Sequence, residues 1–192
     1  MHTRRPGQQP CLHGALVLLG TCAVAAFLLN FHLASASALE GIEEKIKSAM
    51  IVNFIRFVKW PVEDQAQSGG HLVVGVMGAD PIAAVLKTQE GRIIDGKSLS
   101  IRRVERLEDI CQCHVVFVGS PHPWRDDEVL AAAKNAPVLT IGDSAEFCRN
   151  GGIIRLFREK NNIRFEINHI AATQSRLQVS AKLLEIATAV IR

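Results

Sequence analysis

The chain lacks the short motifs of serine hydrolases and of dinucleotide-binding domains. There is no Gly-x-Ser-x-Gly elbow for a nucleophilic serine and no Gly-x-Gly-x-x-Gly fingerprint. The segment Gly75–Asp80 carries no Walker Lys-Ser/Thr pair, so Gly78 is better interpreted as a tight turn than as part of a phosphate-binding loop. The 22 lysines and arginines are nearly balanced by 19 aspartates and glutamates, which gives no electrostatic case for nucleic acid as a partner, because neutralising phosphates requires gathered cations. Tyrosine is absent, tryptophan occurs twice, and no repeat or low-complexity stretch is present. These absences leave a single globular domain of ordinary composition as the best interpretation.

The N-terminal residues have the composition of an export signal. Arg4 and Arg5 precede an apolar run, Gly14–Leu29, that contains no charge, and small residues follow over 34–38. The apolar run of about 16 residues is shorter than the roughly 20 that span a bilayer. This order of basic, apolar and small segments predicts a secretory signal peptide.

The small residues predict where the signal is removed. Alanines in A-x-A spacing favour cleavage between Ala38 and Leu39, with Ala36 as a second candidate site. No cysteine follows this region closely, which argues against a lipoprotein anchor. We therefore expect residues 1–38 to be a signal peptide and residues 39–192 to be one exported, almost neutral periplasmic domain without a cofactor.

The remaining chain alternates between predicted helices and strands. An apolar spacing of three and four residues predicts a helix over 42–60, stopped by Pro61, with positions 42, 46, 49, 50, 53, 54, 57 and 58 on one buried stripe. Strands are expected at 72–77, 98–104, 114–118 and 137–141, and helices after Asp80, over 125–135 and from a cap at Ser144 to Cys148. This alternation predicts a mostly parallel sheet flanked by helices.

The C-terminal part has a different pattern. Apolar segments at 153–157 and 163–167 flank a polar turn, which predicts an antiparallel hairpin with Arg164 and Glu166 on its outward face. The spacing after Ser180 predicts a closing helix over 180–191. The fold class is thus α/β, with a mostly parallel sheet, a C-terminal antiparallel hairpin and a closing helix.

Several segments together resemble the YfiR family of periplasmic regulators. The similarity extends in colinear order over nearly all of residues 42–191. It is carried by Asn53–Pro61, Gly75–Pro81, Cys113–Phe117, Leu139–Ser144, Phe147, Gly151–Ile154, Ile163–Asn168, Ala171–Ala172 and Leu177–Leu184.

The resemblance implies regulation by protein binding rather than catalysis. Its best-known members restrain an inner-membrane diguanylate cyclase by contacting its periplasmic domain, and a peptidoglycan-associated outer-membrane lipoprotein can sequester the repressor. Cyclic di-GMP then rises, which favours biofilm and reduces motility. On this basis we expect the same two partners here, with a second copy of the chain as a further candidate.

This chain departs from the resemblance at its cysteines. Several relatives have a cysteine where this chain has Gly75, so a disulfide from that position to Cys113 cannot form here. Relatives also carry a cysteine pair around the short helix and the Gly-Gly strand, whereas only Cys148 lies nearby in this sequence. The disulfides that the family implies are therefore in doubt for this chain.

Three cysteines follow the predicted signal: Cys111, Cys113 and Cys148. An odd number in an oxidising compartment indicates one pair and a free thiol, or intermolecular pairing. Cys111 and Cys113 are too close in sequence to bridge without strain, and the expected separation of either from Cys148 exceeds the Cα distance of about 7 Å that a disulfide allows. A disulfide and reduced thiols both stay open, and all three residues are redox candidates.

Other constellations favour ordinary structural roles. Cys111, Cys113 and His114 could ligate zinc or copper, but they lack the usual C-x2-C spacing. Ser120, His122, Asp143 and Ser144 supply the residue types of a catalytic triad, but Ser144 is better interpreted as a helix cap. Glu159 and Glu166 flank a hairpin turn and are better interpreted as solvated than as a glycosidase pair.

Two surfaces remain as candidate functional sites. The loop Ser120–Arg125 contains Trp124 and Arg125, residue types that commonly anchor protein contacts, although Trp124 could equally pack over the sheet. With Arg164 and Glu166 they form our candidate partner surface, while Trp60 is expected in the core. The alternative hypothesis is a small-ligand sensor with a pocket near Gly78, Ser120 and Asp143, at the carboxyl ends of the strands.

Overall fold

The computed structural model describes residues 41–62, 69–78 and 80–192, so the predicted signal peptide and its cleavage site between Ala38 and Leu39 lie outside the described residues. The strands of the main sheet are β2 (His71–Met77), β3 (Ile93–Ile94), β4 (Lys97–Arg103), β5 (Val115–Val118), β6 (Leu139–Gly142), β7 (Ile154–Glu159), β8 (Asn162–Asn168) and β10 (Ala189–Ile191). A separate antiparallel pair joins β1 (Val58–Lys59) and β9 (Gln178–Val179). The helices are one over residues 41–55, α3 (Asp80–Lys87), the 3-10 helix η1 (Leu107–Gln112), α4 (Asp126–Ala133), α5 (His169–Gln174) and α6 (Ala181–Ile186).

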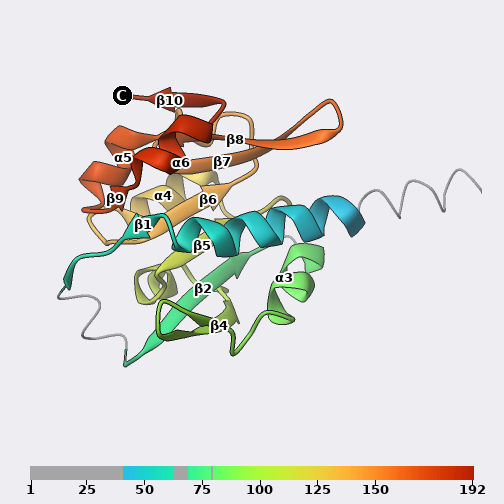
Figure 1. The fold of residues 1–192 in the computed structure, drawn as a ribbon, viewed down its shortest axis with the longest axis vertical. Coiled ribbons are helices and arrows are strands. Elements are labelled where there is room, and N and C mark those ends of the chain that lie inside the picture. The colour runs from blue at the N-terminus through green and yellow to red at the C-terminus, as the bar shows by residue number, and fades with distance from the viewer. Residues whose placement is uncertain (1–40, 63–68, 79) are drawn as a thin grey trace, which may run out of the picture. The chain divides into compact units, whose positions relative to one another are not determined.

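The main sheet has the order β10-β8-β7-β6-β5-β2-β4-β3 (Figure 1). Its central strands, from β4 through β2, β5 and β6 to β7, are all parallel, while β8 pairs antiparallel with β7. The predicted fold class is therefore confirmed, including the mostly parallel sheet and the C-terminal hairpin. Helices cover both faces of the sheet, as parallel strands require because crossovers bring helices onto the sheet.

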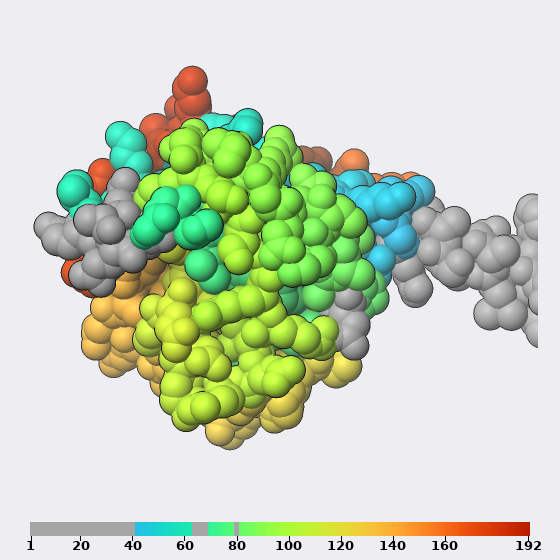
Figure 2. All heavy atoms as spheres, turned by 90° about the horizontal axis from the view of Figure 1, so that it is seen from below, coloured from blue at the N-terminus to red at the C-terminus, as the bar shows by residue number. Residues whose placement is uncertain are grey.

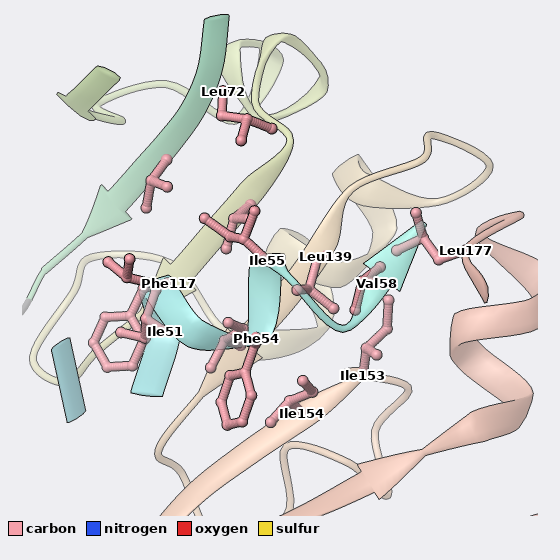
Figure 3. Packing of buried hydrophobic residues seen from close by; sticks show 14 of the residues in the cluster. Ile51, Phe54, Ile55, Val58, Leu72, Phe117, Leu139, Ile153, Ile154 and Leu177 are labelled. Atoms are coloured by element: carbon pink, nitrogen blue, oxygen red, sulfur yellow. The ribbon is translucent and has the colours of Figure 1, made fainter. Parts of the chain in front are cut away.

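Residues that alternate along each central strand divide into two cores. On one face Val74, Val76, Phe117 and Ile141 belong to a broad apolar cluster that is covered by the 41–55 helix and α3. Figure 3 shows Ile51, Phe54 and Ile55 of that helix among side chains from β5, β6 and β7. On the other face a smaller cluster lies under η1 and α4; its buried members are Met77, Val104, Ile110, Cys113, Val116, Val118, Val129, Ala133, Val138 and Phe147.

The 41–55 helix is shorter than predicted. It ends five residues before Trp60, and Val58 and Lys59 instead form β1 opposite Val179 and Gln178. The backbone N–H of Ser180 also donates to the Phe57 carbonyl at 2.8 Å. Pairing with a segment about 120 residues away overrides the local helical spacing, which sequence periodicity alone does not register. Trp60 is buried, as expected.

The buried face of this helix also differs from the prediction. Ile42 and Ile46 are 54% and 42% exposed, and Ala49 and Asn53 are exposed as well. The face turned to the sheet consists of Ile51, Val52, Phe54 and Ile55 together with the polar residues Lys47 and Ser48. Phe54 and Val58 of the predicted stripe are buried, but the prediction was wrong for positions 42, 46, 49 and 53, because the buried face also takes in Lys47 and Ser48 and is rotated away from those four positions.

Two further helices were predicted incorrectly. Residues 145–151 form turns instead of a helix capped by Ser144, whose hydroxyl binds Asp126, and the Phe147 ring packs against Gly142 and Gly152. At the C-terminus Ser180 does cap α6, accepting from the Leu183 N–H at 3.3 Å, but α6 ends at Ile186. The chain then extends as β10 alongside β8, which the β-branched residues Val190 and Ile191 favour.

Candidate functional site

The candidate site lies where β2, β5 and β6 end at the same edge of the sheet. Gly78 follows β2 with a φ of +62°, and a Cβ at this position would lie 2.1 Å from the carbonyl oxygen of Gly119 and 2.4 Å from that of Pro121. Only glycine fits such a conformation and so close an approach. The predicted tight turn is confirmed, and it seats the loop Ser120–Arg125 directly against the end of β2.

The polar side chains at this edge are tied to one another. His122, whose side chain is 7% exposed, has its Nε2 3.4 Å from Oδ1 of Asp126, and the Ser144 hydroxyl donates to the other oxygen of that carboxylate. Asp143 accepts the backbone N–H of Ser120 at 3.4 Å. Asp126 thus links the loop after β5 to the segment after β6.

This arrangement differs from a Ser-His-Asp triad. In a triad the imidazole contacts the serine hydroxyl, so that it can accept the proton of the nucleophile. Here the carboxylate of Asp126 lies between Ser144 and His122 and binds both. Asp143, the acid suggested by the sequence, binds a backbone N–H and a lysine instead. The residue types of a triad are present, but the contacts are those that hold a loop in place.

A buried lysine connects this edge to the first core, and the sequence analysis missed it. Lys47, 9% exposed, lies 2.9 Å from Glu43 and 3.5 Å from Asp143. Burying a charge is costly unless it is paired, so these two carboxylates stabilise Lys47 at the sheet edge. The signal was a charged residue inside an apolar helical repeat, four residues after a glutamate. Through Asp143, which pairs with Lys47 and accepts the Ser120 N–H, the 41–55 helix and the loop Ser120–Arg125 are joined by an ion pair and a hydrogen bond.

The loop presents Arg125 to solvent and Trp124 only in part. Trp124 is half-buried and packs against the second cluster, which confirms packing over the sheet, while its partner contact stays a prediction. Arg125 is exposed and lies 3.0 Å from Asp127, and its backbone N–H donates to Glu128 at 2.8 Å, which fixes the start of α4. Hollows of about 710 Å³ and about 610 Å³ flank the loop, and Trp124 lines both.

The second part of the predicted surface is on the hairpin. Arg164 is exposed, 3.7 Å from Glu159, whereas Glu166 is 20% exposed and pairs with Arg155 at 3.4 Å. The Arg155 guanidinium lies over the Phe157 ring, 4.7 Å from its centre. In the described part of the chain no hydrogen bond or ion pair joins this group to Trp124 or Arg125. The structure thus assigns the four candidate residues to two separate groups.

All three described cysteines are free. Cys111 is exposed, and its Sγ lies 3.3 Å from the Ala132 carbonyl. Cys113 and Cys148 are buried, and burial raises the pKa of both thiols, that of Cys148 to about 12. Since the thiolate is the reactive form, Cys111 is the strongest redox candidate of the three.

The side chains around Cys113 have other partners than a metal. His114 accepts the Val73 N–H through Nδ1 at 3.1 Å, and its ring meets the edge of Trp60. Cys113 Sγ lies 3.6 Å from the Asp109 carbonyl. Among residues 41–62, 69–78 and 80–192, no cluster of three or more histidine, cysteine or acidic side chains could hold a metal ion.

Comparison with known proteins identifies a family. A family model described as YfiR/HmsC-like (DUF4154) matches residues 44–188. No curated protein sequence matches the chain significantly. Over the described residues, no helix has the length and apolar character needed to cross a membrane.

Two solved structures align with part of the chain. One is the ABC domain in complex with L-Trp from Streptococcus pneumonia, with 9% sequence identity and a TM-score of 0.47 over 75% of this chain. The other is a conserved domain protein from Vibrio cholerae, with 15% identity and a TM-score of 0.45 over 68% of this chain. The aligned region spans 60% of each of these two chains.

Proposed function

The chain belongs to the YfiR/HmsC-like family, and we propose that it binds and restrains an inner-membrane diguanylate cyclase through the periplasmic domain of that enzyme. Family membership supports a periplasmic regulatory role in general. Restraint requires that the regulator bind the inactive state of the cyclase more tightly than the active state, because a ligand shifts an equilibrium only by its difference in affinity. Cyclic di-GMP, and with it biofilm formation, would then fall.

The observation that carries the proposal is the family match over residues 44–188. The geometry of the loop Ser120–Arg125 supports it, because its polar side chains are engaged in holding the loop rather than in a nucleophile–base contact. Arg125 and the half-buried Trp124 then lie at the surface on a fixed backbone. A fixed loop with an arginine and an aromatic side chain suits protein recognition, since little conformational entropy is lost on binding.

The test is recovery of the cyclase with the tagged full chain from membranes of its source cells, together with the cellular cyclic di-GMP level. We expect a diguanylate cyclase in the complex and a rise in cyclic di-GMP when the chain is removed. Arg125→Glu should weaken the complex without changing thermal stability, whereas Lys160→Glu, an exposed lysine of the hairpin turn, serves as the control for charge. An unchanged cyclic di-GMP level and no recovered cyclase would refute the proposal.

The same experiment extends to the other two expected partners and to redox control. We propose that an outer-membrane peptidoglycan-associated lipoprotein competes for the chain and relieves restraint. A second copy of the chain is a further candidate, with exposed Cys111 available for an intermolecular disulfide. Repeating the recovery under oxidising and reducing conditions tests this: a change that disappears in Cys111→Ser assigns redox sensitivity to that thiol.

A second candidate function is supported by the hollow of about 710 Å³ beside the loop. It is lined by Ser120, His122, Asp126, Ser144 and Asn150, among others, and side chains do not fill it. Pockets of about 300–1,000 Å³ with a few convergent polar groups commonly hold small ligands. A periplasmic solute that raises the melting temperature of the wild type but not of Ser144→Ala would favour this sensor role.

A further inference from the structure

The 41–55 helix carries a second apolar stripe that faces away from the sheet. Ile42, Ile46 and Ala49 are all exposed, and the polar Asn53 continues the same face. Their spacing of four, three and four residues is that of a coiled-coil seam in which the last position is polar. The sheet is already covered by the opposite face of the same helix. The helix is therefore apolar on two sides, which is the pattern of a helix with a neighbour on each side.

A groove runs beside this stripe, between the 41–55 helix and α3. It encloses about 610 Å³, and its lining includes mostly small side chains: Ser48 and Ala49 from one helix, Ala84 and Val85 from the other. In Figure 2 the blue atoms at the start of the 41–55 helix lie beside the green atoms of α3 at the surface. Small residues at the base of a two-helix groove let a third helix approach closely, with its ridge between the two.

The rim of the groove has one sign of charge. Lys45 and Arg92 both line it, and none of the described residues that line it carries a carboxylate. The buried hydroxyl of Ser48 has no hydrogen-bond partner in the described part of the chain, so it adds a polar group at the base without a protein acceptor. An occupant with carboxylates beside its apolar face would complement this rim.

The positive rim also distinguishes among the segments that could bind in the groove. In a two-fold dimer of this chain the same patch would face itself, bringing Lys45 and Arg92 of one copy towards those of the other. The apolar segment Gly14–Leu29 of the chain itself contains no acidic residue that could pair with them. We propose that this stripe and groove bind an amphipathic helix of a partner protein, with small or apolar residues on one face and Asp or Glu beside it.

This surface is distinct from the loop Ser120–Arg125, and the inference does not depend on the partner being a cyclase. The test places a photo-crosslinking residue, p-benzoylphenylalanine, at Ala49 in the full chain in its source cells, with a parallel variant at Arg125. Crosslinked peptides are then mapped by mass spectrometry. We expect Ala49 to crosslink to a segment of another protein that has helical apolar spacing and adjacent Asp or Glu residues.

Charge reversal makes the test specific. The double variant Lys45→Glu/Arg92→Glu should lower the yield of the Ala49 crosslink by about tenfold, because like charges then face each other. The matched double variant Lys160→Glu/Arg164→Glu, which changes the same charge on the hairpin, should leave the yield unchanged. All four side chains are exposed, so the variants are expected to fold, and their melting temperatures confirm this.

The other outcomes overturn the inference in distinguishable ways. Crosslinks from Ala49 to a second copy of the chain would identify a homodimer surface, and crosslinks to residues 14–29 would identify an internal contact. A mapped segment without acidic residues, or no crosslink, would also refute it. If Ala49 fails this test but the Arg125 variant captures a diguanylate cyclase, the proposed function stands and the groove proposal fails. If the Arg125 variant captures no cyclase but Ala49 crosslinks to an acidic helix of another protein, the groove proposal stands and the proposed function fails.

Discussion

The two faces of the central sheet are packed by different means. The face under the 41–55 helix is a broad layer of large apolar side chains, whereas the face under η1 and α4 has fewer of them and depends on close contacts at glycines. The second face places Cys113 at Gly75 and Phe147 at Gly142, with hardly any space between them. The first face thus supplies most of the hydrophobic stabilisation, while the second is the less tolerant of added atoms and supports the loop Ser120–Arg125.

The largest effect is expected from removing volume on the first face. Ile51→Ala should lower the free energy of unfolding by about 2–5 kcal/mol, because Ile51 is fully buried and its loss leaves a cavity. The same substitution at Ile46, five residues earlier on the same helix, should cost less than about 1 kcal/mol because Ile46 is 42% exposed. Urea unfolding of both variants measures the difference; equal losses would show that the outer stripe is covered in the folded chain.

The second prediction adds atoms to the second face at Gly75. A Cβ there would lie 2.8 Å from Cys113 Sγ and 2.6 Å from a Val104 methyl carbon. We expect reduced Gly75→Cys to be destabilised by crowding, and oxidised Gly75→Cys to form a disulfide with Cys113 that raises stability by about 2–4 kcal/mol over the reduced form.

Thermal unfolding with and without reductant, and mass spectrometry of the linked peptides, measure this effect. Gly75→Ser is the matched control, because it adds similar volume and cannot form a disulfide. If the melting temperature of Gly75→Cys is independent of reductant, the two positions do not meet as the structure places them.

Much of this arrangement could be predicted from the sequence, and the errors have a common cause. The central strands and the hairpin have strong local patterns, as does the turn at Gly78, and all of these were predicted correctly. The end of the first helix depends on the pairing of Val58 with Val179, and β10 depends on β8. Val179 lies far from Val58 in the sequence, and the residues of β10 also have a spacing that is compatible with a helix. Local propensity therefore could not identify either pairing.

The candidate site was predicted in part for the same reason. The loop Ser120–Arg125 and its strand-end position followed from the strand pattern. The link from Lys47 to Asp143, and that of Asp126 to both His122 and Ser144, joins residues from different elements. Each is an ordinary polar residue in its own segment. Only the folded chain shows that they form a network, and that Glu166 pairs with Arg155 instead of facing a partner freely.

The third prediction tests the tolerance of the second face without a disulfide. In Gly142→Ala the new Cβ would lie 2.4 Å from ring atoms of Phe147, which is fully buried. Overpacking of this kind costs about 1–3 kcal/mol. In the Phe147→Leu background, Gly142→Ala should cost less stability than it does in the wild type, since the ring that the new Cβ meets is gone. Additive losses in this double-mutant cycle would place the strain elsewhere.

The smallest expected effect concerns the thiols, where the two buried cysteines and Cys111 differ in reactivity. A thiol-reactive dye added to the native chain at pH 8 should label Cys111 first, and Cys113 and Cys148 only after unfolding, because burial excludes the reagent and raises both pKa values. With a pKa of about 12, Cys148 is thiolate in roughly one molecule in ten thousand at pH 8. Peptide mapping after timed quenching separates the three residues.

The raised pKa of Cys148 also predicts the direction in which the stability of the fold changes with pH. Above pH 9 the unfolded chain releases the Cys148 proton, since the unperturbed thiol has a pKa of 9.0, while the folded chain keeps it until about 12. The folded state then binds more protons than the unfolded state, so stability falls as the pH rises across this window. Cys148→Ala should remove part of that decline, whereas Cys111→Ala should not. Rapid labelling of Cys148 in the native chain would instead show that the turn segment 145–151, which carries Phe147 of the second face, opens readily, and the contrast between the two faces would then extend from packing to dynamics.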